Sequence, residues 1–149
     1  MAHFFSYNSP AITNISLAPF GLDAFYLNVV REDMLHPFVS GNKFRKLKYN
    51  IVAAEDNGFS TLLTFGGAFS NHIAAVAAAG KELNFKTIGV IRGEELLYKI
   101  AQNPTLSFAK DCGMELHFIS REDYKRKEEE QLLTKLKNKF GDFYILPEG

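Results

Sequence analysis

The fold is decided by residues 61–72, which read TLLTFGGAFSNH. The run Thr61–Phe65 is apolar and rich in residues that favour strands. Two glycines then mark a tight turn, and Ser70 stands where a helix cap is expected. The alanine-rich stretch that follows predicts a helix from about Ser70 to Asn84. A strand that turns directly into a helix is typical of parallel α/β sheets.

The same alternation continues toward the end of the sequence. Strands are predicted at Lys86–Ile91, Glu115–Ile119 and Phe143–Leu146, and helices at Leu106–Asp111 and Glu122–Lys139. This succession implies right-handed crossovers. We therefore expect an α/β fold with a parallel sheet of about four strands and helices on both faces. The alternating charges of the last helix are most simply those of a solvated face.

A further helix is predicted upstream, from Asn42 to Asn57. Four apolar residues recur there at helical spacing: Phe44, Leu47, Ile51 and Ala54. Gly58 stands where a left-handed C-terminal cap would fall. The preceding forty residues predict a loop-rich arm with one short strand, Phe25–Val30, and the turn Ser40-Gly41-Asn42 leads from this arm into the helix.

The start of that helix breaks a local preference. Its first turns carry four cations, Lys43, Arg45, Lys46 and Lys48. The helix dipole disfavours positive charge there, at about 0.3–1 kcal/mol for each exposed cation. Places where a sequence breaks a local preference are enriched in functional sites, so we expect a small anion to bind at this helix start.

Composition narrows the possible functions. The chain has 149 residues, the length of one ordinary domain, and 46% hydrophobic with 23% charged residues indicate a globular protein. Seventeen basic residues balance seventeen acidic ones, which gives no electrostatic case for nucleic acid or an anionic membrane. Cys112 is the single cysteine and favours a reducing, cytoplasmic location. Residues 1–10 lack a signal-peptide pattern, and no apolar stretch is long enough to span a bilayer.

Two segments contain candidate functional residues, and each can also be explained by a purely structural role. The turn Gly66–His72 offers unpaired N–H groups to an anion, but on spacing alone it is more often a tight turn with a serine cap. Lys43 borders the apolar face, where a desolvated amine becomes nucleophilic, but such a lysine more often keeps its charge in water. An isolated His72 is likewise more often a hydrogen-bonded surface or edge histidine than a catalyst. No Ser/His/Asp order or His/Cys cluster supports a hydrolase triad or a metal site.

Taken together, the two segments resemble a known family. Residues 31–49 resemble the cofactor-lysine segment of the 1-aminocyclopropane-1-carboxylate deaminases and D-cysteine desulfhydrases, pyridoxal-phosphate enzymes of the tryptophan-synthase-β fold type. Residues 64–72 resemble the family's Gly-Gly-x-x-Ser-Asn-(His or Gln) loop, and residues 145–149 resemble the strand that leads back into its larger domain. The resemblance spans nearly the whole chain, in the correct order.

The resemblance implies a role for each site residue. Lys43 would hold pyridoxal 5'-phosphate covalently and then act as the proton-transfer base, while Asn42 would shape the phosphate side or the helix start. Asn71 would hydrogen-bond the ring hydroxyl of the cofactor. Ser70, Asn71 and His72 would bind the substrate carboxylate, with Ser70 also assisting the chemistry. The reaction would convert a small amino acid, of the 1-aminocyclopropane-1-carboxylate or D-cysteine type, to ammonia and a 2-oxo acid.

The resemblance also implies a division of the chain. Residues 1–50 would form an arm and the cofactor-lysine helix of a larger domain, and residues 51–149 a small α/β domain. The glycine-rich phosphate loop and later tyrosines of the family have no counterpart, so little or no turnover is expected from these residues alone. The arm would pack on the larger domain or support a homo-oligomer such as a dimer. Ala74-Ala75 stand where typical members place polar residues, which leaves substrate positioning open.

Two other classes of function remain open from the residues. One is a non-catalytic α/β module that binds a small anion or nucleotide in the Gly66–His72 loop. The other is a truncated interaction domain that pairs with a longer relative.

Overall fold

Four short strands form the sheet at the centre of the molecule. The computed structural model describes residues 9–148. Its main sheet contains β5 (Glu115–Ile119), β4 (Lys86–Arg92), β3 (Thr61–Gly66) and β6 (Tyr144–Leu146), hydrogen-bonded in that order. All three pairings are parallel. The predicted class and the predicted number of strands are confirmed.

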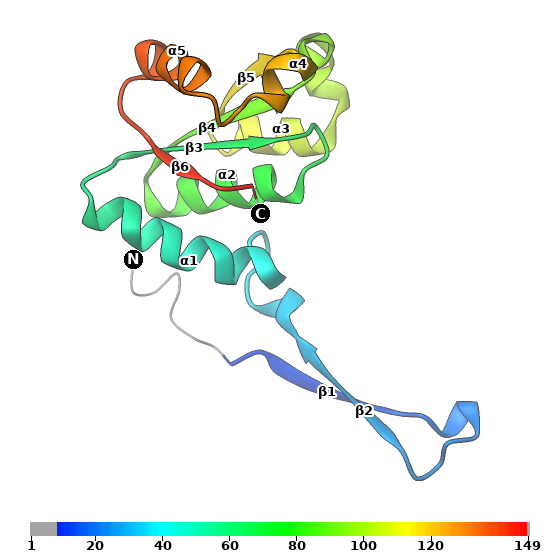
Figure 1. Cartoon of the computed structure of the whole chain (residues 1–149). Coiled ribbons are helices and arrows are strands. Elements are labelled where there is room, and N and C mark those ends of the chain that lie inside the picture. Colours follow the sequence, from blue (N-terminus) through cyan, green and yellow to red (C-terminus); the bar gives the residue numbers. More distant parts are fainter. Residues whose placement is uncertain (1–8, 149) are drawn as a thin grey trace.

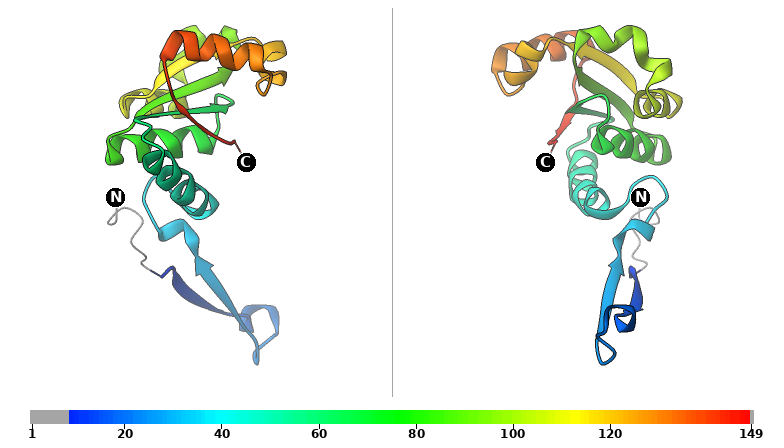
Figure 2. Two further views of the ribbon diagram at one scale, coloured as in Figure 1. Left: turned by 60° about the vertical axis from the view of Figure 1, so that its left-hand side comes forward. Right: turned by 90° about the vertical axis from the view of Figure 1, so that its right-hand side faces the viewer.

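Helices cover both faces of this sheet (Figures 1 and 2). On one side lie α1 (Gly41–Asp56), α2 (Asn71–Leu83) and α3 (Pro104–Asp111), and on the other α4 (Arg121–Lys125) and α5 (Glu130–Phe140). Successive side chains of β3 point alternately to the two faces of the sheet. Leu62 packs with the helices α1, α2 and α3, and Leu63 packs with α4 and α5. The sheet is therefore buried on both faces, as the nearly continuous apolar sequence of β3 requires.

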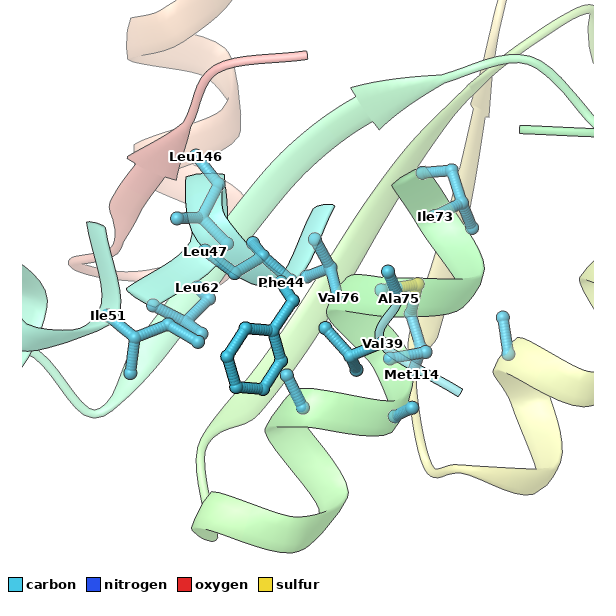
Figure 3. Packing of buried hydrophobic residues seen from close by; sticks show 14 of the residues in the cluster. Val39, Phe44, Leu47, Ile51, Leu62, Ile73, Ala75, Val76, Met114 and Leu146 are labelled. Atoms are coloured by element: carbon cyan, nitrogen blue, oxygen red, sulfur yellow. The ribbon is translucent and has the colours of Figure 1, made fainter. Parts of the chain in front are cut away.

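The predicted apolar face of α1 is confirmed, since its four residues, Phe44, Leu47, Ile51 and Ala54, are all buried. Figure 3 shows Phe44 and Leu47 among Leu62 of β3 and Val76 of α2. Because α1 packs directly on α2, the start of each helix is held in a fixed relation to the other. The helix crosses residue 50, and the predicted domain division at that position stays a prediction.

The long charged helix predicted at Glu122–Lys139 is wrong, because the chain forms α4 and α5 with residues 126–129 between them. Tyr124 and Leu136 pack into the same buried cluster against β3 and β4. In one straight helix, two residues twelve positions apart would point about 120° away from each other. Breaking the helix lets both side chains reach the sheet.

The arm contains one strand more than predicted. Strand β1 (Ala11–Ser16) pairs antiparallel with β2 (Tyr26–Arg31), and the hairpin extends away from the helices and sheet (Figure 1). Every residue of β1 is exposed. Its sequence lacks the regular apolar alternation that predicts a strand. Three short 3-10 helices complete the described chain: η1 (Ala18–Phe20), η2 (Glu32–Met34) and η3 (Glu94–Gln102).

Two expectations concern membranes and targeting. Across residues 9–148, no helix is both long enough and apolar enough to cross a bilayer. Residues 1–10, where no signal-peptide pattern is expected, lie mostly outside the described residues.

Candidate active site

Lys43 and Asn71, predicted from separate sequence segments, line one cavity. The cavity has a volume of about 410 Å³ and lies between the starts of α1 and α2. Its walls are formed by seven residues: Phe38, Ser40, Asn42, Lys43, Asn71, Ala74 and Ala75. This volume is within the range of pockets that bind small molecules. The structure thus brings together Asn42, Lys43 and Asn71 of the predicted site.

The loop before Lys43 is fixed by a histidine that the sequence analysis missed. Nδ1 of His36 accepts hydrogen bonds from the backbone N–H groups of Phe38 at 3.2 Å and Val39 at 3.0 Å. Its Nε2 therefore carries the proton and donates to Glu82 of α2, 3.2 Å away. Gly41 then adopts φ +59°, which glycine reaches without strain, and α1 begins. These contacts attach the lysine-bearing turn to α2.

The cavity lies at a concentration of positive charge. Two helix starts border it, and the first turn of each contains no acidic residue. Arg45 is engaged elsewhere, since its guanidinium donates to Glu32 with an Nε–Oε2 distance of 2.7 Å. Lys43 therefore contributes its ammonium beside two helix N-termini, which themselves favour anions. The arrangement suits a small anionic ligand, and the anion expected at this helix start stays a prediction.

The glycine loop is shaped by close packing. A side chain on Gly66 would place its Cβ 2.5 Å from Cγ1 of Ile73, whereas a Cβ on Gly67 would meet only Arg92, at 3.7 Å. Gly66 is thus required where β3 passes into α2. The hydroxyl of Ser70 accepts a hydrogen bond from the N–H of Ile73 at 3.4 Å, so the predicted helix cap is present. Ser70 is half-buried and is not among the residues that line the cavity.

His72 is placed differently from its neighbour Asn71. Its side chain is buried, and Nε2 lies 2.9 Å from the hydroxyl oxygen of Thr64. Burial, followed by the ammonium groups of Lys43 and Lys46, lowers the pKa of His72 to about 4. The ring is therefore neutral at pH 7. The predicted role of His72 at a substrate carboxylate stays a prediction, since the residue does not line the cavity.

Four wall residues were not predicted to belong to the site: Phe38, Ser40, Ala74 and Ala75. Ala74 and Ala75 had a sequence signal, because they replace the polar residues expected from the family resemblance. Their short side chains leave room beside Lys43. Phe38 and Ser40 had no sequence signal beyond their position just before α1.

A larger cavity of about 520 Å³ lies elsewhere, with Lys46, Lys127 and Glu148 among its lining residues. Lys127 and Glu148 form an ion pair, and none of the predicted site residues lines this cavity. We favour the smaller cavity as the active site because three of the predicted site residues, Asn42, Lys43 and Asn71, line it. Within residues 9–148, no three His, Cys, Asp or Glu side chains gather as metal ligands would.

Comparison with known proteins identifies similar chains. No protein-family model matches the sequence. A bifunctional D-cysteine desulfhydrase/1-aminocyclopropane-1-carboxylate deaminase of Arabidopsis thaliana is 33% identical over 129 residues, which cover 81% of this chain and 32% of that protein. A putative 1-aminocyclopropane-1-carboxylate deaminase of Thermotoga maritima is 34% identical over 128 residues, which cover 84% of this chain and 39% of that protein.

Solved structures of similar proteins also superimpose on this chain. The crystal structure of an ACC deaminase homologue superimposes with a TM-score of 0.69 at 26% identity, covering 93% of this chain and 42% of that one. A hydrogen-sulfide-producing enzyme of Fusobacterium nucleatum, at 15% identity and a TM-score of 0.65, shares the fold. The chain spans 32% and 39% of the length of the two curated relatives named above.

Proposed function

Because the chain belongs to the family of 1-aminocyclopropane-1-carboxylate deaminases and D-cysteine desulfhydrases, we propose that the cavity between α1 and α2 is part of a pyridoxal-phosphate site. The reaction would release ammonia and a 2-oxo acid from a small amino acid. The observation that carries this proposal is the meeting of Lys43 and Asn71 at one cavity bordered by two helix starts.

The residues present fit the cofactor. Lys43 offers an amine, Asn42 and Asn71 offer amides, and the surrounding positive charge suits a phosphate. The small side chains of Ala74 and Ala75 leave space for a ring. When bound, pyridoxal phosphate supplies an electron sink that stabilises negative charge at the α-carbon of an amino acid.

The protein's own groups would divide the remaining work. Lys43 would hold the cofactor through its amine, and its Nζ would take or return a proton. Asn71 would donate a hydrogen bond to the ring hydroxyl of the cofactor, and Asn42 would shape the phosphate side or the helix start. Ser70 and Asn71 orient the substrate carboxylate at the start of α2, where the helix dipole favours negative charge. For Ser70 this requires a small rearrangement of the loop, since the residue does not line the cavity.

The described residues account for only part of such a site. The curated relatives are much longer than this chain, and their additional length is available for further contacts to cofactor and substrate. We accordingly expect little or no turnover from these 149 residues alone. The cytoplasmic location inferred from the single cysteine also stays a prediction, and one relative is named as mitochondrial.

We further propose that the hairpin of β1 and β2 is an association surface. It would pack either on a second copy of this chain in a homo-oligomer or on additional polypeptide beyond this sequence. Large apolar side chains are exposed on and beside it, namely Ile12, Ile15, Phe20, Phe25, Tyr26, Leu27 and Val30. A two-stranded hairpin with this much exposed apolar surface is marginal in water by itself. The molar mass in solution, measured by light scattering, tests association between copies.

Covalent labelling tests the main proposal. The protein is titrated with pyridoxal phosphate and reduced with borohydride, and the labelled peptide is identified by mass spectrometry. We expect one adduct per chain, on Lys43, and none at this position in Lys43→Ala. Lys48→Ala, which removes a lysine from the same helix, is the matched control and keeps the adduct.

Two results would contradict the proposal. Labelling spread over surface lysines, or unchanged labelling of Lys43→Ala, would show that the cavity is not a cofactor site. Saturable binding of phosphate or a nucleotide without any covalent adduct would instead favour the anion-binding module, which the two helix starts also support.

A further inference from the structure

The carboxylate site at the start of α2 consists of uncharged side chains. Ser70 and Asn71 carry no charge, and His72 is neutral at pH 7 because its pKa is lowered to about 4, chiefly by burial. Lys43 would be occupied by the cofactor. A carboxylate is bound most strongly by a charged donor, and a guanidinium can give it two parallel hydrogen bonds. An arginine beside the glycine loop would therefore complete the site.

Arg92 lies at that position. It is the last residue of β4, and the residue before it, Ile91, pairs with Gly66 at the end of β3. A Cβ on Gly67 would lie 3.7 Å from Nη2 of Arg92, so the guanidinium is beside the backbone of the loop. In open α/β sheets, ligands bind outside the carboxyl ends of the strands. Arg92 is exposed there, and a ligand can reach it.

The turn of the loop brings Ser70 to the same place. The backbone N–H of Ser70 donates to the carbonyl oxygen of Gly67 at 3.1 Å, so Ser70 and Arg92 are both neighbours of Gly67. Ser70 does not line the cavity that contains Lys43, but the next residue, Asn71, does. The loop thus extends from the cavity on one side to Arg92 on the other.

The guanidinium is held by an aromatic ring. Cζ of Arg92 lies 5.5 Å from the centre of the Tyr124 ring, within the range of a cation–π contact. Tyr124 is 8% exposed and its hydroxyl donates to Glu148 at 2.7 Å, so the ring itself is fixed. A ring face attracts a guanidinium without accepting its hydrogen bonds in the plane. The contact therefore orients Arg92 and leaves its N–H groups for a planar acceptor.

The protein's own carboxylates are engaged elsewhere. Within residues 9–148, Arg92 forms no ion pair, whereas every other arginine pairs with a carboxylate. Glu95, on the segment that follows β4, pairs with Arg121 at 2.7 Å, and Glu148 pairs with Lys127 at 2.5 Å. A ligand carboxylate at Arg92 would not have to displace an existing ion pair.

We propose that Arg92 binds the carboxylate of the substrate, together with Ser70, at the glycine loop. This inference rests on the proposed function, since it assumes that the ligand is an amino acid whose amine faces Lys43. It adds one charged residue to a set of neutral groups. The ligand class is then a small amino acid with a free carboxylate, and an analogue without this charge should bind weakly.

The test compares two ligands that differ in this one group. D-alanine has a carboxylate, whereas D-alaninamide has an uncharged amide of similar shape and the same amine. Each is titrated into the full chain without cofactor, and nuclear magnetic resonance follows the Nε–H signal of Arg92 and the backbone N–H signal of Ser70. We expect D-alanine, but not D-alaninamide, to shift both signals. No shift of the Arg92 signal with D-alanine would overturn the proposal.

Substitutions measure the contribution of the guanidinium. Arg92→Met should weaken the binding of D-alanine, read from the Ser70 signal, by about tenfold or more, as expected for hydrogen bonds to a charged group. Arg92→Lys keeps the charge without the paired donors and should lose less. Arg126→Met is the matched control, since it removes an exposed arginine that pairs with Asp123, and it should leave the affinity unchanged. Equal affinities of the parent and Arg92→Met would contradict the inference.

These results are separable from the labelling of Lys43. An adduct on Lys43 together with equal affinities of the parent and Arg92→Met would keep the cofactor site and reject the role of Arg92. Weakened D-alanine binding in Arg92→Met without any adduct on Lys43 would reject the cofactor site. It would retain Arg92 as the carboxylate-binding residue of a non-catalytic module.

Discussion

The hydroxyl of Tyr124 donates a hydrogen bond of 2.7 Å to the carboxylate of Glu148, and so fixes the end of the described chain to α4. Nζ of Lys127 donates to the same carboxylate oxygen at 2.5 Å. Burial raises the pKa of Glu148, but the hydrogen bonds from Lys127 and Tyr124 outweigh burial, and the net pKa lies below its usual value. The chain after β6 is thereby held against the break between α4 and α5.

Removal of the Tyr124 hydroxyl tests this attachment. We expect Tyr124→Phe to lower the free energy of unfolding by about 1–2 kcal/mol, because the buried hydroxyl donates to a charged acceptor. Urea unfolding measures the change. Tyr98→Phe, at a tyrosine that is 89% exposed, serves as the control and should leave stability unchanged. Equal losses in the two variants would show that the hydrogen bond contributes nothing specific.

The two adjacent glycines of the loop should respond differently to alanine. Gly66→Ala should destabilise the protein by about 1–3 kcal/mol, because its Cβ would overlap Ile73. Gly67→Ala should change stability by less than about 0.5 kcal/mol, because the nearest atom stands at an ordinary contact distance. Thermal or urea unfolding of both variants measures this. If Gly67→Ala is the more damaging of the two, the packing of the loop is not as described.

Ser70 can be tested for its two roles separately. Ser70→Ala should lower stability by about 1 kcal/mol through loss of the helix cap. Ser70→Asp should keep the cap, since aspartate accepts the same N–H, but it should repel a carboxylate ligand. Urea unfolding measures the cap, and binding of a small amino acid to the cofactor-loaded protein measures the ligand contact. Ligand binding that is equal in the parent and in Ser70→Asp would limit Ser70 to the structural role.

The buried His72 predicts a pH dependence of stability. Its pKa is about 4 in the folded protein and about 6.5 in the unfolded chain. The unfolded state therefore binds a proton first as the pH falls. Stability from this group is fully present above pH 6.5 and is lost toward pH 4, by on the order of 3 kcal/mol.

His72→Gln should remove that component of the pH dependence. Urea unfolding of the parent and the variant at several pH values between 7 and 4 gives the difference in slope. His117, whose pKa is also lowered, chiefly by burial, remains in both proteins and cancels in the comparison. Parallel stability curves for the two proteins would mean that His72 titrates normally in the folded state.

Local patterns in the sequence determined the fold class and the two functional segments. The period of apolar residues placed α1 and its buried face, and the turn residues Gly66-Gly67 placed the junction between β3 and α2. Resemblance to a family assigned Lys43 and Asn71 to a common site. Each of these signals is contained in a short stretch of sequence, so it can be recognised without the folded structure.

Tertiary structure alone decided the rest. The break between α4 and α5 arises because Tyr124 and Leu136 must both reach one face of the sheet. The burial of His72 depends on Thr64, whose hydroxyl is oriented by Leu146, 82 positions away in the chain. The meeting of two helix starts at one cavity depends on how α1 packs on α2. Such contacts join residues that are distant in sequence, and no local pattern encodes the distances between them.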